Sequence, residues 1–357
     1  YKLGRIFDFV VSGDPFDVPP TSTLLLFLSG FEIEWPWLRF QCRFNLGKQI
    51  TNGFVENKWD ETLVTCPISP EVLLSNQMKF NVSIVSTQRQ KHIISDVEIP
   101  LYVRRYHNIS VYTMIRDKSR ELTEWIEYHL LLGIEHFYLY DNFSNDEIGA
   151  VLKPYLEKNL VTIIRWPFKP NDGVYWNTIQ RSSMNHALKN FGPFNRWMGY
   201  FDVDEYFQPN DMIANLITNS STSLATLLDT AYPERDYPCG VQFEQWRISC
   251  FLSQTDLIQS RYSLTLEKCN VILDDRLRVP QKMFLRPKHI PILLNIHQLE
   301  SGLEYKSNVS WREFGRFRHY HYGKVGDSED LKKENARIDR TMDRYISILK
   351  QRIIKYQ

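Results

Sequence analysis

Two aspartates separated by one residue, Asp202 and Asp204, are the strongest candidates for chemistry in this 357-residue sequence. They follow the apolar segment 196–201, which has the pattern of a buried strand. Side chains alternate along an extended segment, so we expect both carboxylates on one side and Val203 in the core. Such close carboxylates repel each other, and a hard cation with oxygen ligands, Mn²⁺ or Mg²⁺, relieves that repulsion. The pair therefore indicates a divalent metal site, while a solvated acidic turn would use the same residues.

The elements that would position these acids alternate between strand and helix. Strand-like segments lie at 109–115, 134–140, 160–166 and 196–201, and helical segments lie between them at 121–132, 146–159 and 175–191. This alternation predicts an α/β fold with a parallel sheet that binds its ligand at the carboxyl ends of the strands. Asp141 and the Asp202/Asp204 pair both follow such strands. A charged helix is predicted for 329–356.

The first 106 residues have a different pattern. Short strand-like runs lie at 23–28, 39–44, 61–66, 80–85 and 97–103, with Gly, Pro, Asn and Asp between them. We expect an antiparallel, sandwich-like module that is either structural or binds carbohydrate through Trp35, Trp37 and Trp59. The sequence therefore predicts a β-rich accessory domain at 1–106 and an α/β domain at 107–357.

Composition limits the possible partners. The 43 basic and 42 acidic residues leave a formal charge of +1, which argues against nucleic acid as a partner. No apolar run approaches the roughly 18 residues that span a bilayer. The chain begins at Tyr1 without Met, so a membrane anchor upstream stays open.

The cysteines and the glycosylation sequons favour a secretory compartment. No two of the five cysteines form a CxxC pair, and we expect two disulfides, one in the N-terminal third and one closing the loop between Cys250 and Cys269, with Cys239 left over. Buried free thiols are the alternative. Asn-x-Ser sequons begin at Asn81, Asn108, Asn142, Asn219 and Asn308. We therefore expect the lumen of the secretory pathway, with the Golgi as its most suitable compartment for an anchored lumenal domain.

Three segments, 124–129, 133–142 and 201–206, resemble glycosyltransferase family 92. They read Glu-Trp-Ile-Glu-Tyr-His, Gly-Ile-Glu-His-Phe-Tyr-Leu-Tyr-Asp-Asn and Phe-Asp-Val-Asp-Glu-Tyr. The similarity covers roughly residues 107–323 and continues through Lys282, Arg286-Pro287, His297 and His319-Tyr320. It implies a Rossmann-like GT-A fold and inverting, metal-dependent sugar transfer. Known members are β-1,4-galactosyltransferases that use UDP-galactose and act on a glycan acceptor. The β-rich region agrees with the N-terminal carbohydrate-binding module of plant members.

The resemblance also implies roles for individual residues. Asp202, Asp204 and His319 would hold Mn²⁺ or Mg²⁺ against the donor diphosphate, with His321 as the alternative histidine. Five further residues would contact the nucleotide sugar: Arg116, Asp141, Gln180, Asn185 and Lys282. Each of these five also has a plain structural reading, as a solvated, turn or helix-surface residue.

The acceptor side is defined less sharply. An inverting transfer needs a carboxylate base, for which Glu244 is our candidate and Asp256 and Glu300 are rivals. Trp246 and Tyr175 are candidate platforms for a sugar ring, and Trp176 is an alternative to Tyr175. Ordinary core packing explains most such aromatics.

Two other functions are compatible with parts of the sequence. A carbohydrate-binding or scaffold protein with an inactive GT-A domain is one. A Mg²⁺-dependent nucleotidyltransferase is the other, but it would need a glycine-rich phosphate loop after the first strand, and 116–119 contains no glycine. The joint presence of Asp202, Asp204, Lys282 and His319 argues against the inactive domain.

Overall fold

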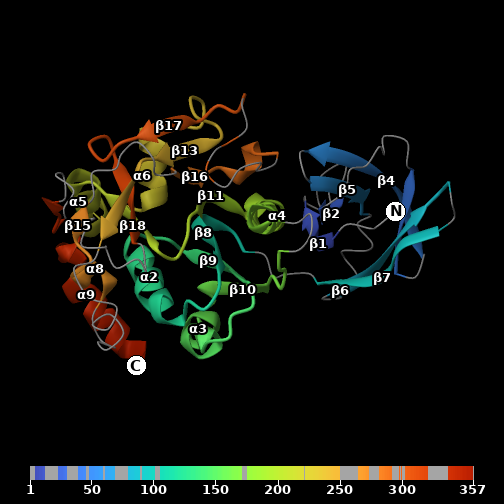
Figure 1. Cartoon of the computed structure of the whole chain (residues 1–357). Helices are drawn as coiled ribbons and strands as arrows, with labels where there is room; N and C mark the ends of the chain where they lie inside the picture. The colour runs from blue at the N-terminus through green and yellow to red at the C-terminus, as the bar shows by residue number, and fades with distance from the viewer. Residues whose placement is uncertain are drawn as a thin grey trace. The chain divides into compact units, whose positions relative to one another are not determined.

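The structure is a computed structural model of the chain, and Figure 1 shows its arrangement of helices and strands. It describes residues 5–12, 23–29, 39–45, 48–58, 61–68, 79–88, 91–100, 105–170, 175–220, 222–249, 264–272, 281–291, 297, 299, 302–320 and 337–356. The chain divides into two compact units. The first comprises Tyr1–Tyr106, Phe168–Phe194 and Pro291–Ile296, and the second comprises His107–Pro167, Asn195–Ile290 and His297–Gln357.

The first unit contains an antiparallel sheet of seven strands in the order β1-β2-β5-β4-β3-β6-β7. The strands are β1 (Arg5–Ser12), β2 (Thr23–Ser29), β3 (Phe40–Phe44), β4 (Gln49–Lys58), β5 (Glu61–Pro67), β6 (Lys79–Ser86) and β7 (Lys91–Pro100). Sequence patterns missed β1 and β4. The helix α4 (Trp176–Asn190) also belongs to this unit.

A disulfide shows that this sheet folds over itself. Cys42 of β3 is bonded to Cys66 of β5, although β4 lies between these strands. Strands two apart in a flat sheet are about 9.5 Å apart, whereas the two Cα atoms are separated by 5.9 Å. Gly53 of β4 lies beneath the bridge, where an added Cβ would stand 2.8 Å from the Cys42 sulfur. The absence of a side chain at Gly53 therefore gives this bridge room to cross β4.

The central sheet of the second unit has the strand order β10-β9-β8-β11-β16-β13-β17. Its first four strands are β8 (His107–Ile115), β9 (His136–Asp141), β10 (Val161–Arg165) and β11 (Asn195–Tyr200), all parallel as predicted. Helices α2 (Ser119–Leu131) and α3 (Ile148–Glu157) lie beside them (Figure 1). Strand order reverses between β8 and β11, and such a reversal creates a ligand crevice at the carboxyl ends of the two strands.

Three shorter strands extend this sheet beyond β11. They are β16 (Lys282–Leu285) and β13 (Gly240–Phe243), joined antiparallel, and β17 (Lys306–Val309), which runs parallel to β13. β16 pairs with β11 so that Tyr200 lies opposite Met283. Lys282 directly precedes Met283 and is the first residue of β16, so this antiparallel register brings it to the carboxyl end of β11.

A third sheet has the order β12-β18-β14-β15-β19. Its strands are β12 (Glu205–Pro209), β18 (Gly315–Tyr320), β14 (Gln245–Ser249), β15 (Val271–Ile272) and β19 (Arg337–Ile338). Buried aromatic rings join this sheet to the central one: Phe207 and Phe317 contact Phe243 and Phe284. Other α-helices in the described part of this unit are α5 (Asp211–Ser220), α6 (Leu224–Ala231), α8 (Thr265–Lys268) and α9 (Asp343–Ile353).

Some sequence predictions were wrong or incomplete here. The structure describes the segment predicted as a helix at 329–356 only from residue 337, where Arg337–Ile338 form β19 and helix α9 begins at Asp343. Between these elements Asp339 accepts hydrogen bonds from Thr341 and pairs with the buried Arg316. The disulfide prediction is confirmed for Cys42–Cys66. Cys269 is also disulfide-bonded and Cys239 is free, while Cys250 lies outside the described residues.

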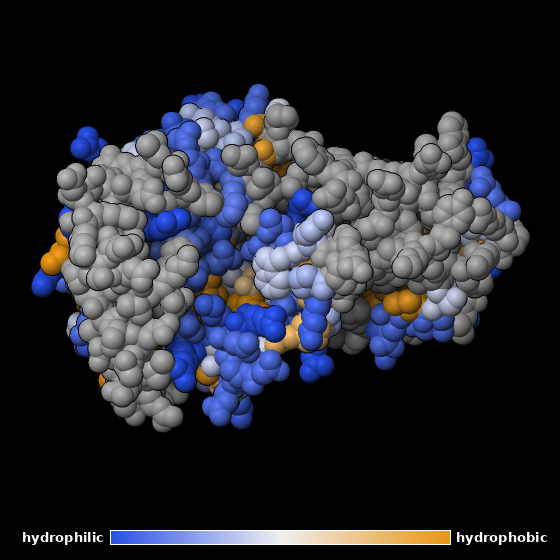
Figure 2. Space-filling view, viewed as in Figure 1, coloured by the Kyte–Doolittle hydropathy of each residue, from blue (hydrophilic) through white to orange (hydrophobic). Residues whose placement is uncertain are grey.

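The surface in Figure 2 is mainly hydrophilic where residues are described, with hydrophobic ones in small separate groups. Among the described helices, none is long and apolar enough to cross a membrane.

Candidate functional site

The two aspartates lie in the short connection between the central sheet and the third sheet. β11 ends at Tyr200 and β12 begins at Glu205. The amide of Glu205 donates to the carbonyl of Asp202 at 3.0 Å, which closes a turn. The prediction of an extended segment was therefore wrong, because this turn lets the chain change sheets. Val203 is buried as expected.

Lys282 is held between two of the acids of this turn. Its Nζ lies 2.9 Å from Asp202 Oδ2 and 3.0 Å from Glu205 Oε2. Burial lowers the pKa of Lys282, but the two carboxylates outweigh it and raise the pKa above its ordinary value. Lys282 is therefore a charged ammonium group fixed at the carboxyl end of β11.

Asp204 faces His319 of the adjacent strand. β12 and β18 are paired with Glu205 opposite His319, and His319 Nε2 lies 3.8 Å from Asp204 Oδ2. Burial lowers the pKa of His319, but Asp204 and Glu205 outweigh it and raise the pKa. Burial raises the pKa of Asp204, but the interaction with His319 and, to a smaller extent, the charges of Lys118 and Lys282 outweigh it. The pKa of Asp204 is therefore below its ordinary value.

The Asp204–His319 pair fits a divalent metal. With metal–ligand bonds of about 2.1 Å, two ligands stand about 3.0 Å apart at a right angle and about 4.2 Å apart when opposite. The 3.8 Å between Asp204 Oδ2 and His319 Nε2 falls in this range. Three carboxylates and one ammonium also leave a formal charge of −2 when His319 is neutral, which a divalent cation would offset.

No cluster of three His, Cys, Asp or Glu side chains that could hold a metal occurs among the described residues. Two protein ligands suffice for a site of the kind that Mg²⁺ forms, where substrate phosphates and water supply the other ligands. Asp202, the third predicted ligand, instead forms an ion pair with Lys282. The structure thus brings Asp204 and His319 together and places Asp202 beside the lysine.

Glu205 is a site residue that sequence reasoning missed. Its buried carboxylate accepts hydrogen bonds from the backbone amide of Asp202 at 2.8 Å and from Gln245 Nε2 at 2.5 Å, in addition to Lys282. His319 Nδ1 lies 4.0 Å from Glu205 Oε1. Burial raises the pKa of Glu205, and Lys282 opposes this effect. Its place directly after Asp204 was the only signal in the sequence.

Helix α2 holds β12 through three side chains of the 124–129 motif. Trp125 Nε1 donates to the carbonyl of Glu205 at 2.9 Å, and the Tyr128 hydroxyl donates to the carbonyl of Phe207 at 2.7 Å. His129 Nε2 accepts from the amide of Phe207 at 3.3 Å, while Nδ1 lies 2.8 Å from the carbonyl of Trp125. Burial lowers the pKa of His129 to about 3, so the ring is neutral. The motif fixes the strand that follows the acidic turn.

Glu124, the first residue of the motif, has a structural role. Its carboxylate accepts hydrogen bonds from the amides of Thr265 at 2.7 Å and Leu266 at 3.0 Å, at the start of α8. These bonds satisfy amides that have no partner within the helix.

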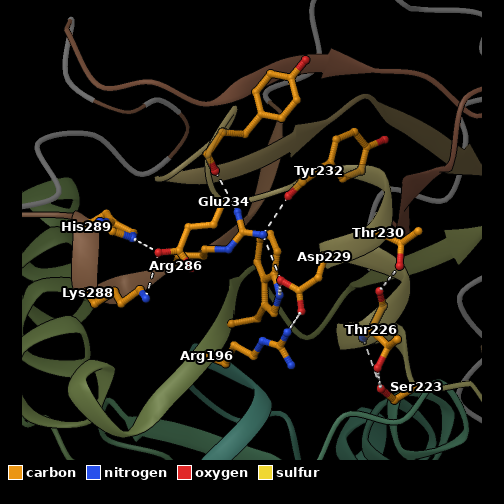
Figure 3. A network of polar contacts seen from close by, with 12 residues as sticks. Arg196, Ser223, Thr226, Asp229, Thr230, Tyr232, Glu234, Arg286, Lys288 and His289 are labelled. Carbon is orange, nitrogen blue, oxygen red and sulfur yellow. Dashed lines mark hydrogen bonds and ion pairs between the residues drawn. The ribbon is translucent and has the colours of Figure 1, made fainter.

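Arg286 joins β16 to the loop that follows α6 (Figure 3). It is buried, stacks 3.8 Å from the ring centroid of Trp197 and donates to the carbonyls of Tyr232 and Tyr237 at 2.7 Å. Asp229 accepts from both Arg286 and Trp197. Since Trp197 is on β11, these contacts help to fix the pairing of β11 with β16 that places Lys282.

A pocket of about 480 Å³ lies where β8 and β9 end. It is lined by Asp117, Ser119, Arg120, Glu121, Asn145 and Asp146. Its two loops are joined by bonds from Ser119 N to Asp146 Oδ2 at 2.7 Å and from Asn145 N to Asp117 Oδ1 at 2.7 Å. The predicted nucleotide residues Arg116 and Asp141 adjoin this pocket in sequence but do not line it. Asp141 accepts from the amide of Ser144 at 3.0 Å.

Trp246 and Glu244, two of the residues predicted for the acceptor side, both contact other side chains or backbone of the protein. Trp246 is buried and carries the guanidinium groups of Arg316 and Arg337 over its ring, at 4.5 and 5.3 Å from the centroid. Its predicted use as a sugar platform disagrees with this packing. Glu244 Oε1 accepts from the amide of Trp311 at 2.7 Å.

The remaining predicted residues lie elsewhere in the chain. Gln180 and Asn185, on α4, and Tyr175, which is exposed, belong to the first unit. His297 lies within electrostatic range of Lys282 and Asp202. Burial is the main cause that lowers the pKa of His297 to about 4, and the charge of Lys282 is the second. His321, Asp256 and Glu300 lie outside the described residues.

Comparison with known proteins identifies the family. The profile of glycosyltransferase family 92 matches residues 109–354, and the chain belongs to this family. A family 92 protein of Ricinus communis is 25% identical over 225 residues, which is 57% of this chain and 39% of that protein.

Some relatives carry names that state an activity. A galactan beta-1,4-galactosyltransferase of Arabidopsis thaliana is 37% identical over 92 residues, which is 24% of this chain and 18% of that protein. A beta-1,4-galactosyltransferase of Caenorhabditis elegans is 27% identical over 191 residues, covering 48% of this chain and 44% of that protein. The chain thus spans less than half the length of each of these relatives.

Among solved structures, S. aureus TarS 1-349 is 12% identical, with 46% of each chain covered and a TM-score of 0.27. A TM-score at this level does not establish a common fold.

Proposed function

We propose that the second unit is a metal-dependent glycosyltransferase domain of the GT-A type. It would transfer galactose from UDP-galactose to a glycan acceptor with inversion, giving a β-linkage. The observation that carries this proposal is the Asp204–His319 pair beside the ammonium of Lys282, at the sheet position where strand order reverses. Family membership supports sugar transfer, and the names of the Arabidopsis and C. elegans relatives support galactose.

The residues of the site suit the departure of a nucleoside diphosphate. A divalent ion held by Asp204 and His319 would neutralise charge on the leaving diphosphate. Lys282 supplies a second positive charge that is already held in place, so little reorganisation opposes the reaction. The pocket at the ends of β8 and β9 is large enough to hold part of the nucleoside.

The acceptor hydroxyl must lose its proton to a carboxylate on the side opposite the leaving group. Glu244 remains our candidate for this base. It directly follows β13, whose last residue, Phe243, is opposite Lys282 in the sheet register.

We also propose the Golgi lumen as the site of action. The disulfide between Cys42 and Cys66 and the second disulfide at Cys269 support an oxidising compartment.

A screen of nucleotide sugars and glycan acceptors with Mn²⁺ tests the proposal directly. We expect transfer from UDP-galactose, abolished by EDTA and restored by Mn²⁺, and a new β-linkage in the product by NMR. Transfer at full rate in EDTA would refute the metal site. Binding of GDP in preference to UDP would refute the donor. Binding of UDP without transfer to any acceptor would favour the inactive scaffold.

A further inference from the structure

We propose that Glu205 is a positioning residue for the donor diphosphate, because it holds Lys282 in place while Asp202 gives up its contact to the incoming phosphate. This inference rests on the proposed function and assigns separate tasks to the two carboxylates that contact Lys282.

The two carboxylates differ in exposure. The side chain of Glu205 is 2% exposed, whereas that of Asp202 is 38% exposed, and both lie about equally close to Nζ. A phosphate oxygen that arrives from solvent can therefore replace Asp202 at the ammonium but cannot reach past Glu205.

Glu205 is also anchored by several contacts of its own. Its Oε2 accepts from Lys282 and from the amide of Asp202, and its Oε1 accepts from Gln245. The strand that begins at Glu205 is held in turn by Trp125 of α2. An anion fixed from several sides keeps Lys282 directed at one point when its second partner leaves.

The exchange leaves the ammonium of Lys282 paired with two anionic groups throughout. Before the donor binds, the ammonium is paired with two carboxylates, and afterwards it is paired with Glu205 and one phosphate oxygen. Asp202 thus stabilises the buried ammonium only in the absence of donor.

The test compares the affinities for UDP and uridine in the presence of Mn²⁺, measured by calorimetry on the full chain. Only UDP carries the diphosphate, so the ratio of the two dissociation constants reports on Lys282 and cancels general damage to the nucleoside pocket. Charge-assisted hydrogen bonds of this kind support a change of about tenfold. We expect Glu205→Gln to lower the UDP preference about tenfold, and Lys282→Met to lower it at least as much.

The double variant decides whether Glu205 acts through Lys282. Glu205→Gln combined with Lys282→Met should lose no more preference than Lys282→Met alone. Glu127→Gln is the matched control, because Glu127 is also buried and paired with a cation, Arg352 at 2.5 Å, but on the side facing α9. It should keep the wild-type ratio even if it lowers the melting temperature.

Three results would overturn this inference. One is a wild-type UDP preference in folded Glu205→Gln, and another is multiplication of the two losses in the double variant. If Glu205→Gln does not fold, Glu205→Asp takes its place. The shorter side chain of Asp withdraws the carboxylate from Lys282, so the UDP preference of this variant should be lower than that of the wild type. An unchanged ratio of the two dissociation constants in Glu205→Asp is the third result that would overturn the inference. A wild-type chain that binds UDP no better than uridine would instead refute the proposed function itself.

Discussion

At the scale of single residues, the three acids of the turn between β11 and β12 have two partners, Lys282 and His319. Asp202 and Glu205 contact Lys282, whereas Asp204 faces His319. Three acids in four positions therefore have distinct surroundings. The pair that we propose to bind a metal, Asp204 and His319, therefore does not include the two carboxylates that contact Lys282.

Asp204→Asn is predicted to weaken Mn²⁺ binding in the presence of UDP by at least about 100-fold, because it removes a charged metal ligand. Loss of a residue that only supports a metal ligand already lowers metal affinity by about 10- to 100-fold. His319→Ala should have a similar effect. Titration of Mn²⁺ followed by electron paramagnetic resonance measures this affinity. Glu234→Gln is the control, since Glu234 pairs with Lys288 and His289 and contacts neither Asp204 nor His319 in any ion pair described above (Figure 3). Wild-type Mn²⁺ affinity in both site variants would show that the ligands lie elsewhere.

The sequon at Asn142 is predicted to carry no glycan. Asn142 is 1% exposed, and its Nδ2 donates to the carbonyl of Trp166 at 2.7 Å, so the folded chain has no room for a sugar there. Asn219 is exposed and can carry one. Mass spectrometry of peptides from secreted protein distinguishes the two positions. A folded, secreted chain glycosylated at Asn142 would contradict the packing of this loop.

At the scale of elements, α2 contacts both sheets that meet at the site, through Trp125 against Phe137 of β9 and through its bonds to β12. Its Trp125, Tyr128 and His129 contact β12, and its Glu124 contacts the start of α8. These residues lie three and four positions apart, so they share neighbouring faces of the helix. The segment 124–129 is therefore explained by structural contacts behind the site.

The contact of Glu124 with α8 predicts a pH-dependent stability. Burial, opposed by the two amides, raises the pKa of Glu124 from 4.5 to about 6. A raised carboxyl pKa means that the folded state binds the proton more tightly, so stability is greatest below pH 4.5 and falls as pH rises through 6. The loss amounts to about 2 kcal/mol.

Glu124→Gln, which cannot ionise, isolates this contribution. The free energy of unfolding of the wild type relative to this variant should fall by about 2 kcal/mol between pH 4.5 and pH 7. Urea unfolding at several pH values measures the difference. A difference that does not vary with pH would show that Glu124 ionises at the same pH in the folded and unfolded chain.

At the scale of the whole molecule, each compact unit has its own means of stabilisation. The second unit is held by aromatic packing between two sheets, and the first by a sheet folded over the Cys42–Cys66 bridge. A bridge between residues 24 apart stabilises a fold by about 3 kcal/mol through the unfolded chain.

Replacing both Cys42 and Cys66 by Ala should therefore lower the stability of the first unit by about 3 kcal/mol. Hydrogen exchange followed by mass spectrometry should show lost protection in peptides from β3 and β6, with little change in peptides from β8 and β9. Equal loss of protection in both units would show that they unfold as one.

The sequence by itself determined the order of most elements and the types of the site residues. Alternation of apolar segments predicted β8 to β11 within one or two residues, because these strands are buried in an apolar core. The family motifs identified glycosyltransferase family 92. The short strands β15 and β19 gave no usable periodicity. Residues 337–342 lie within the predicted helix 329–356 but are not helical, and Asp339 there pairs with Arg316.

Only the tertiary structure decided which partner each charged residue has. Glu205, Lys282 and His319 are separated by 77 and 37 positions in the chain, 282 − 205 and 319 − 282, and local patterns cannot report contacts at such distances. The change of sheet after Tyr200 turned the acidic segment, and the pairing of β16 with β11 and of β18 with β12 brought the lysine and the histidine to it. Long-range strand pairing therefore placed a buried carboxylate, a paired ammonium and the Asp204–His319 pair, which we propose as the metal site, at one turn.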